Sequence, residues 1–430
     1  MSLARTAGFL VLANLGAMPV AAQSDHLRDQ ILGLFSFGDC GSPLCLNSSV
    51  NTQTIHGSHY IPATQASAAD LTGFLGSAIT LAVSSVPISA ATSGVTFRFE
   101  GGVPVATSVS AGPIFGERVQ TLGRGRFLLG VNATAVDFKA VRGVPLDNLT
   151  FRFTHQNVRD PALGNPLLEN DVIEVSTSLN LNMQVASLYL SYGLLDRLDL
   201  GVAVPLVRTD LSGGSTARVL PFSFPTPHFF GTAANPSLSA ASTVGGTATG
   251  IGDVLARMKV NLGGSERGAF GFLIDARFPT GAEEDFLGSG EFALRGLGIV
   301  SGRFGNFSPH LNLGYQYRSG TSITDAVLAT AGFDDLLAPW ATLAVDVITQ
   351  WQAGTSPVEL PGDVVFTQPV LHTVQQTDIP NRRDDLIDGS FGFKFRIGNG
   401  ATAVTNILIP LNNAGIRGNA AGTVGLEYTF

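Results

Sequence analysis

Charge is scarce in this 430-residue sequence, because only 13% of the residues are Asp, Glu, Lys or Arg. Soluble globular domains carry about 25% charged residues. Long hydrophobic runs are also scarce: the best candidate after residue 30, residues 71–91, contains four Ser, two Thr, two Gly and one Pro. A helical membrane span needs about 20 consecutive apolar residues. These two absences argue against an ordinary soluble protein and against a helical membrane protein.

Cysteine is nearly absent, with only Cys40 and Cys45 in the chain. In an exported protein, two thiols on either side of a Gly-Ser-Pro turn predict a small disulfide loop. The alternative is a zinc site that adds His56 and His59 to the two cysteines, but neither the Cys-x4-Cys nor the His-x2-His spacing is a good zinc-finger spacing. We therefore expect no metal and no other cofactor.

Basic residues are outnumbered, since 25 Lys and Arg against 33 Asp and Glu give a net charge of −8. This balance argues against a nucleic-acid partner, which requires a basic patch. The N-terminus has a positive Arg5, an apolar stretch over 6–18 and a small-residue site over 20–22. This order is typical of a secretory signal peptide, which we place at residues 1–22.

The sequence does contain an alternation of apolar and polar residues with a period of two. Over residues 173–185 the odd positions are mainly apolar and the even positions polar, so the two sets lie on opposite faces of a strand. The same pattern recurs through the C-terminal three quarters of the chain. It predicts strands at 124–139, 171–193, 197–209, 250–262, 267–279, 290–302, 307–318, 322–333, 340–352, 384–397, 400–411 and 419–430.

The length of these segments indicates a membrane barrel. Many span 11–13 residues, about twice the 5–6 residues of a soluble strand, and tilted membrane strands need about 9–11. Every second join is short, and the others include the long loops 140–170, 210–249 and 353–383. We predict an all-β, antiparallel transmembrane barrel of about 12 strands, with the apolar sets facing lipid.

Residues 23–123 do not follow this pattern. They contain an amphipathic stretch over 66–86, which predicts a helix, and a predicted hairpin of 95–100 with 103–110. We interpret 23–123 as an N-terminal plug or periplasmic segment and 124–430 as the barrel. If the hairpin joined the wall, the barrel would have 14 strands.

The sparse charges of the strands belong to the face opposite the apolar set. A charge on the lipid face costs up to about 2–4 kcal/mol at mid-membrane, so these side chains are expected to face the lumen. They either contact substrate or form mixed-sign ladders that pair with one another or hold the plug. The candidates are Asp253, Arg257, Lys259, Asp275, Arg277, Asp346, Asp388, Lys394 and Arg396. Glu283–Asp285 is expected to be a solvated loop, or else a site for a divalent ion or lipopolysaccharide.

The chain ends on an alternating strand that carries Tyr428 and Phe430. This ending is similar to the C-terminal signal by which the barrel-assembly machinery recognises outer-membrane barrels. The alternative is that these residues are only the aromatic side chains of a last strand at the membrane interface.

Several stretches, at 112–118, 121–127, 169–173, 192–201, 278–290 and 309–315, resemble the outer-membrane transporter family named for the meta-pathway of phenol degradation. The chain is more distantly similar to long-chain fatty acid transporter barrels, which also have an N-terminal plug. The resemblance implies outer-membrane transport, with aromatic compounds as the substrate class, and it supplies no catalytic motif.

These observations predict a monomeric barrel in the outer membrane of a Gram-negative bacterium, in contact with its lipids and lipopolysaccharide. Its function would be passive uptake or efflux of small hydrophobic or aromatic compounds. The alternative is a closed barrel with a structural or surface-interaction role. An enzyme is not expected, because none of the seven His lies in a local catalytic motif.

Overall fold

The structure is a computed structural model, and it describes residues 26–40, 43–49, 56–61, 75–76, 78–80, 97–100, 103–106, 110–155, 169–265, 267–320, 323–354, 360, 362–398 and 400–430. The predicted signal peptide at 1–22 and most of the predicted helix at 66–86 lie outside the described residues. Within that helix, residues 75–76 and 78–80 are helical. None of the described helices is long and apolar enough to cross a membrane.

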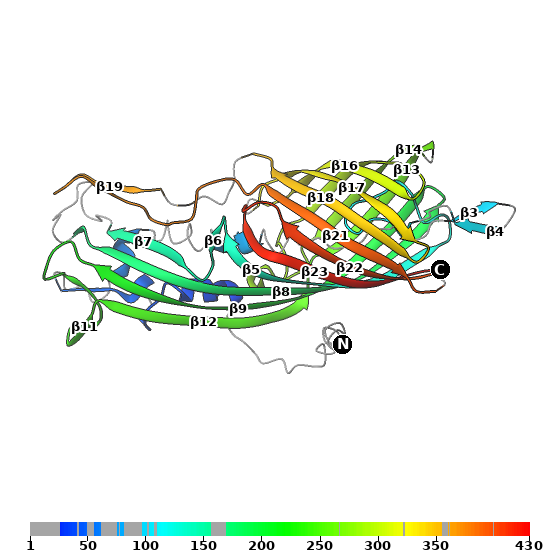
Figure 1. Ribbon diagram of the computed structural model, residues 1–430. Helices are drawn as coiled ribbons and strands as arrows, with labels where there is room; N and C mark the ends of the chain where they lie inside the picture. Colours follow the sequence, from blue (N-terminus) through cyan, green and yellow to red (C-terminus); the bar gives the residue numbers. More distant parts are fainter. Residues whose placement is uncertain are drawn as a thin grey trace, which may run out of the picture.

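A closed antiparallel barrel of 12 strands dominates the structure (Figure 1). The barrel closes at β8, which pairs with β5 on one side and with β9 on the other. This confirms the predicted fold class. The strands are β5 (Phe127–Val141), β8 (Val172–Leu195), β9 (Leu198–Leu220), β13 (Val254–Ser265), β14 (Gly268–Phe278), β15 (Ala293–Ser301), β16 (Phe307–Arg318), β17 (Ala326–Ala338), β18 (Ala341–Gln352), β21 (Leu386–Arg396), β22 (Ala401–Pro410) and β23 (Ile416–Thr429).

The two ends of the barrel differ in their connections. At the end that holds the C-terminus, the strands are joined by 196–197, 266–267, 302–306, 339–340 and 397–400. The opposite end carries the long connections. We call these ends the turn end and the loop end. The hairpin of β3 (Phe97–Glu100) and β4 (Val103–Ala106) lies beyond the turn end and forms a separate sheet, so it does not raise the strand number to 14 (Figure 1).

Strands β8 and β9 continue far past the loop end of the barrel, because they have 24 and 23 residues. There β8 pairs with β7 (Leu149–His155), which pairs with β2 (Tyr60–Ile61), and β9 pairs with β12 (Ser239–Ile251). We call this sheet, in the order β2-β7-β8-β9-β12, the extension (Figure 1).

The extension corrects the prediction that 140–170 and 210–249 are loops. Strand β12 was missed because it is built from Ser, Ala, Thr and Gly, which give no apolar alternation. The remaining short elements outside the barrel wall are α1 (Leu27–Gly33), η1 (Pro43–Cys45), η2 (Gly57–His59), η3 (Glu283–Asp285), β1 (Asn47–Ser48), β6 (Val144–Pro145), β10 (His228–Thr232), β11 (Asn235–Ser237), β19 (Val364–Phe366) and β20 (His372–Val374).

The chemistry of the two faces of β8 reverses along the strand. Nearer the turn end, Leu188 and Leu190 point outward and are exposed, while Ser187 and Ser191 point inward. Toward the loop end and into the extension, the odd positions 173–185 point inward and are mainly buried and apolar, and the even positions are polar and face outward. The expectation that the apolar set of 173–185 faces lipid was therefore wrong. Alternation fixes which residues share a face, but it does not say which face meets lipid.

The same reversal occurs on β9 at the same level. Val202, Val204 and Leu206 are exposed on the outer face, and Arg208 and Asp210 continue that face as an ion pair. Leu206 pairs in register with Ala186 of β8. The outer face thus changes from apolar to polar at one height on two neighbouring strands, which indicates the boundary between lipid and water.

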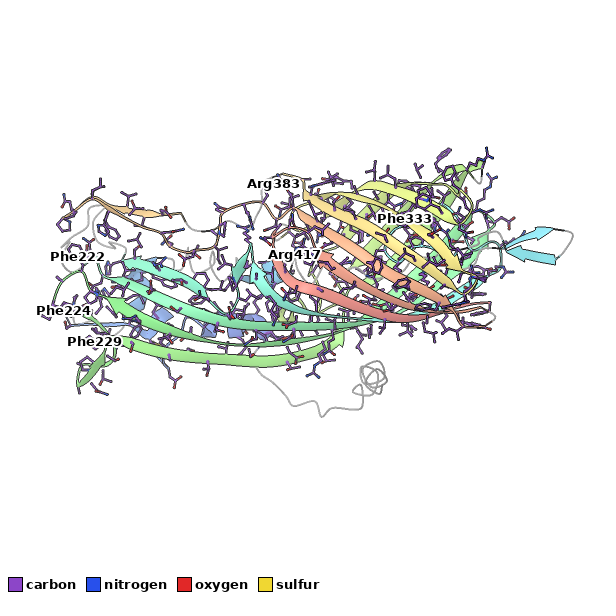
Figure 2. All side chains as sticks on the ribbon, viewed as in Figure 1. Phe222, Phe224, Phe229, Phe333, Arg383 and Arg417 are labelled. Carbon is purple, nitrogen blue, oxygen red and sulfur yellow. A yellow bond between two sulfur atoms is a disulfide. The ribbon has the colours of Figure 1, made fainter. Side chains whose placement is uncertain are left out.

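Aromatic side chains mark both borders of the apolar band. On β16, Phe307 lies at the turn end and Tyr317 at the loop end, ten residues apart in sequence, and both are exposed. At about 3.4 Å per residue and a tilt of about 40°, ten residues span about 26 Å along the barrel axis, close to the roughly 25 Å apolar band of outer-membrane barrels. Phe307 packs against Phe333 of β17, whose ring centroid is 5.1 Å away; Figure 2 labels Phe333 on the barrel wall.

The inner face of the extension is covered by the described residues of 26–59, which we call the cover. Leu27 and Ile31 lie one helical turn apart on α1, and both are buried against the extension. Phe35 follows the helix and packs edge-on against Phe151 and Phe153 of β7, with ring centroids 5.4 and 5.8 Å apart. An isolated seven-residue helix is not stable in water, so this packing stabilises α1.

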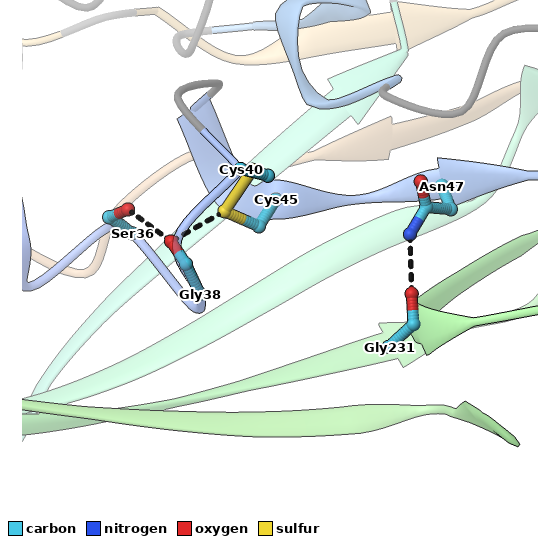
Figure 3. Close-up of a disulfide and its surroundings, with 6 residues drawn as sticks. All are labelled: Ser36, Gly38, Cys40, Cys45, Asn47 and Gly231. Carbon is cyan, nitrogen blue, oxygen red and sulfur yellow. Dashed lines mark hydrogen bonds between the residues drawn. A yellow bond between two sulfur atoms is a disulfide. The ribbon is translucent and has the colours of Figure 1, made fainter.

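Polar contacts hold this N-terminal cover in place. Arg28 pairs with Glu283 at 2.7 Å, and the backbone N–H of Leu27 donates to Asp285. These carboxylates of η3, expected to be solvated or to bind an ion or lipopolysaccharide, instead anchor α1. Further along the cover, Cys40 and Cys45 form a disulfide, and Asn47 donates a hydrogen bond to the carbonyl oxygen of Gly231 beside it (Figure 3).

The reversal on β9 predicts different outcomes for two arginine substitutions on its outer face. Val202→Arg is expected to destabilise the folded barrel by about 2–4 kcal/mol, because it places a charge against the lipid band. Ser212→Arg, on the exposed outer face of the extension, is expected to change stability by less than about 0.5 kcal/mol. Urea unfolding of the protein in lipid vesicles measures both values. Equal effects at the two positions would contradict the assigned boundary.

Candidate functional site

The inward face of the barrel carries the charged residues that the sequence predicted for the lumen. Arg257 and Lys259 of β13, Asp275 of β14, Asp346 of β18 and Lys394 of β21 are all at most 7% exposed. The other four predicted residues lie on the same face or at its rims: Asp253, Arg277, Asp388 and Arg396. Alternation positions them there, because their neighbours in sequence turn apolar side chains outward.

Most of these charges lie in ion pairs between neighbouring strands or between strands separated by one other strand. Arg257 donates through Nε to Asp275 at 2.7 Å, and Lys394 pairs with Glu427 of β23 at 3.2 Å. His310 of β16 contacts Asp346 through Nε2 at 2.7 Å. Such pairing is expected, because burying an unpaired charge costs several kcal/mol.

The loop-end rim has its own pairs. Arg417 contacts Asp388 at 2.8 Å, and Arg383 contacts Asp385 at 3.1 Å. Figure 2 labels both arginines at the loop end of the barrel, beside the start of the extension. Asp253 accepts hydrogen bonds from the backbone and hydroxyl of Ser289. These contacts order the connections around the mouth of the lumen.

Residues 110–122, which we call the lumen segment, lie inside the barrel. Ser110 and Leu122 contact Asp334 and Asp199, which lie near the turn end, and Gly116 contacts Asp346 near mid-barrel. The segment therefore enters from the turn end, reaches the middle of the lumen and returns. Its other hydrogen-bond partners on the inward face are Arg257, Lys259, Ser301, Asn312 and Thr342.

Two opposite charges of the lumen segment bind the wall. Glu117 accepts from Arg257 Nη1 at 2.6 Å and from Lys259 Nζ at 3.2 Å. Arg118 donates to Asp334 at 3.1 Å. Both side chains of the segment are at most 5% exposed. Hydrogen bonds to charged groups contribute about 1.5–3 kcal/mol each, more than those between neutral groups.

The tip of the segment fits the wall closely at Gly116. A Cβ atom at this position would lie 2.2 Å from His310 Nε2 and 2.9 Å from Asp346. No side chain can be accommodated without moving that pair. Apolar contacts flank the tip, since Ile114 packs against Ala344 and Val404 of the wall.

All nine wall residues could be proposed from the sequence, but the residues of the lumen segment that contact the wall could not. Glu117 and Arg118 are visible in the sequence only as two adjacent opposite charges in the stretch 112–118. The cysteine pair lies outside the lumen, in the cover of the extension. Tyr428 and Phe430 lie at the turn end, and the Phe430 ring stacks 5.5 Å from that of Phe127.

Comparisons with known proteins find similarity in structure only. No family model matches the chain, and no curated protein matches it. Among solved structures, an outer-membrane channel from Pseudomonas putida F1 is 12% identical, with 73% of this chain and 98% of that chain covered at a TM-score of 0.40.

Two other similar structures have lower TM-scores. A FadL homologue of Pseudomonas aeruginosa is 13% identical, with coverage of 80% and 97% and a TM-score of 0.32. The toluene transporter TodX of P. putida is 9% identical, with coverage of 71% and 89% and a TM-score of 0.31. The resemblance to the phenol meta-pathway family stays a prediction.

The buried pair of Lys394 and Glu427 gives a prediction about the wall. Lys394→Met is expected to destabilise the barrel by about 3–5 kcal/mol, because it leaves the Glu427 carboxylate buried without its cation. In the double variant Lys394→Met/Glu427→Gln the loss is expected to shrink to about half or less, because no charge remains. Denaturant unfolding in micelles of the wild type, Lys394→Met, Glu427→Gln and the double variant measures the coupling. Strictly additive losses would show that the pair is not coupled.

Proposed function

We propose that this protein is a passive channel of the Gram-negative outer membrane for small hydrophobic or aromatic compounds, and that the lumen segment is its plug. The apolar outer band, its two aromatic borders and the charged inward face support a barrel that spans a membrane. Short turns lie on the periplasmic side of such barrels, so the turn end is periplasmic and the extension projects from the cell.

One observation carries the proposal: the lumen segment is held to the wall by ion pairs and hydrogen bonds. Glu117 and Arg118 pair with wall residues of opposite sign. When the segment withdraws, water can solvate both partners, whereas a lumen filled by an apolar core would have to expose that core. A polar interface of this kind is suited to a plug that opens and closes.

The solute class rests on exposed apolar side chains at the outer end of the extension. Phe222 and Phe224 lie at the end away from the barrel and are 37% and 77% exposed (Figure 2). An apolar solute that arrives from outside would meet these side chains before it meets the charged lumen. The resemblance noted in the sequence points to the same class of compound.

We also propose which molecules contact the barrel in the membrane. Lipids and lipopolysaccharide would contact the outer band, the assembly machinery would recognise the strand that ends at Phe430, and the barrel would act as a monomer. An enzymatic role is not proposed. The buried ring of His310 pairs with the carboxylate of Asp346 through Nε2, which is a different arrangement from the serine–histidine pair of a hydrolase.

Weakening the plug is expected to increase flux. Glu117→Gln keeps the shape of the side chain but removes the charge that binds Arg257 and Lys259. A loss of about 1.4 kcal/mol in plug binding raises the open fraction about tenfold. Planar-bilayer conductance and uptake of an aromatic acid into proteoliposomes measure the effect. The matched control is Glu174→Gln in the extension, where Glu174 pairs with Arg152 outside the lumen; it is expected to leave flux unchanged.

Fixing the plug should have the opposite effect. The backbone N–H of Ala111 donates to the hydroxyl of Thr342 at 2.9 Å, so Ala111→Cys/Thr342→Cys is expected to form a disulfide and abolish flux until it is reduced. Wild-type protein treated with the same reductant controls for the native disulfide. If the wild type and Glu117→Gln both show neither conductance nor uptake, the closed-barrel alternative is correct.

A further inference from the structure

Four of the seven histidines meet in the extension, at its end away from the barrel. His56 and His59 lie just before β2, His155 is the last residue of β7, and His228 is the first residue of β10. The sequence separates these positions by up to 172 residues. Asp171, just before β8, reaches the same cluster.

Three of these imidazoles converge on one point. Ring nitrogens of His56, His155 and His228 all lie within 4.8 Å of one another. The Nε2 atoms of His56 and His155 are 2.8 Å apart, and their rings are stacked. All three residues are less than 9% exposed. His59 lies next to His56, with ring centroids 4.2 Å apart, and is more exposed than the other three histidines.

A carboxylate orients one of the rings. Asp171 contacts His228 Nδ1 at 2.8 Å, and Asp171 is itself held by the hydroxyl of Thr226 and the backbone N–H of Phe222. A carboxylate at Nδ1 keeps the proton on that atom and leaves the lone pair of Nε2 available. This arrangement is typical of the residues that surround a metal-binding histidine.

Hydrogen bonding alone does not account for the cluster. Among the residues that the structure describes, Nδ1 of His56, Nδ1 of His155 and the buried hydroxyl of Tyr60 have no hydrogen-bond partner.

We propose that His56, His155 and His228 bind a divalent transition-metal ion of the zinc type. Three imidazoles without a thiolate suit zinc, copper and nickel better than magnesium or calcium, which prefer oxygen ligands. At metal–nitrogen distances of about 2.0 Å, a tetrahedral site needs nitrogens about 3.3 Å apart. The His56–His155 pair therefore needs to open by about 0.5 Å, and the fourth position is left for water or another small ligand.

The site would link the N-terminal cover to the extension. His56 belongs to the cover, whereas His155 and His228 belong to β7 and β10. A bound ion therefore connects three segments that are distant in sequence and stabilises the cover over the apolar face. This differs from the sequence-based alternative with Cys40 and Cys45, because those two sulfur atoms form the disulfide.

Zinc titration of the tag-free, full-length protein in micelles tests this inference after chelator treatment. We expect one Zn²⁺ per chain, and a Co²⁺-substituted protein with the visible absorption of four-coordinate cobalt. His155→Ala and His228→Ala are each expected to weaken zinc binding by about 100-fold or more. Asp171→Asn is expected to weaken it about 10–100-fold, as for other groups that orient a ligand. The matched control is His26→Ala, at an exposed histidine on the same cover, which should leave affinity unchanged.

Several outcomes would overturn the inference. These are a wild-type protein that binds no zinc, affinity that is the same in all variants, or a cobalt spectrum of six-coordinate type. Circular dichroism of each variant checks its fold. If the alanine variants are misfolded, the cobalt spectrum of the wild type and a zinc-dependent rise in its Tm decide the question, because neither needs a variant. Zinc binding is independent of flux, so its failure would leave the proposed channel function unaffected.

Discussion

Contact with lipid is the constraint on which the rest of this structure depends. Outward side chains of the barrel have to be apolar over the membrane band, because a charge there costs up to about 2–4 kcal/mol. Charged residues of the strands at the level of that band are then directed inward, where they are buried and require partners. Pairs such as Arg257 with Asp275 and Lys394 with Glu427 follow from this requirement. The lumen segment meets this requirement too, because Glu117 contacts a further cation of the wall, Lys259.

The same constraint explains the extension. Where β8 and β9 extend beyond the membrane, their outer faces contact water and carry polar residues, and their apolar residues lie on the inner face. An open sheet with an apolar face is not stable in water unless something covers it. The N-terminal cover supplies that layer through Leu27, Ile31 and Phe35. The two long strands therefore cross from a lipid to an aqueous environment. The cover packs on their inner face in the extension, and the lumen segment lies inside the barrel.

Much of the barrel could be predicted because its signals are local. The alternation over 254–262 and 270–278 identifies strands, and it places Arg257 and Asp275 on the face opposite to the lipid. Other features have no local signal. The small residues of β12 carry no apolar pattern, and the odd positions of 173–185 look the same whether they face lipid or a covered interior. The difference lies in what packs against the strand, and over 173–185 this includes the cover.

The sequence by itself determined the all-β class, a wall of 12 to 14 strands and the inward placement of the nine charged residues. It could do so because a period of two and the length of a strand are properties of consecutive residues. Only the tertiary structure decided that Glu117 lies against Arg257 and that His56 meets His155 and His228. These partners are separated by 99 to 172 residues in the chain. Their encounter depends on barrel closure and on the path of the N-terminal part of the chain, neither of which is encoded in any local pattern.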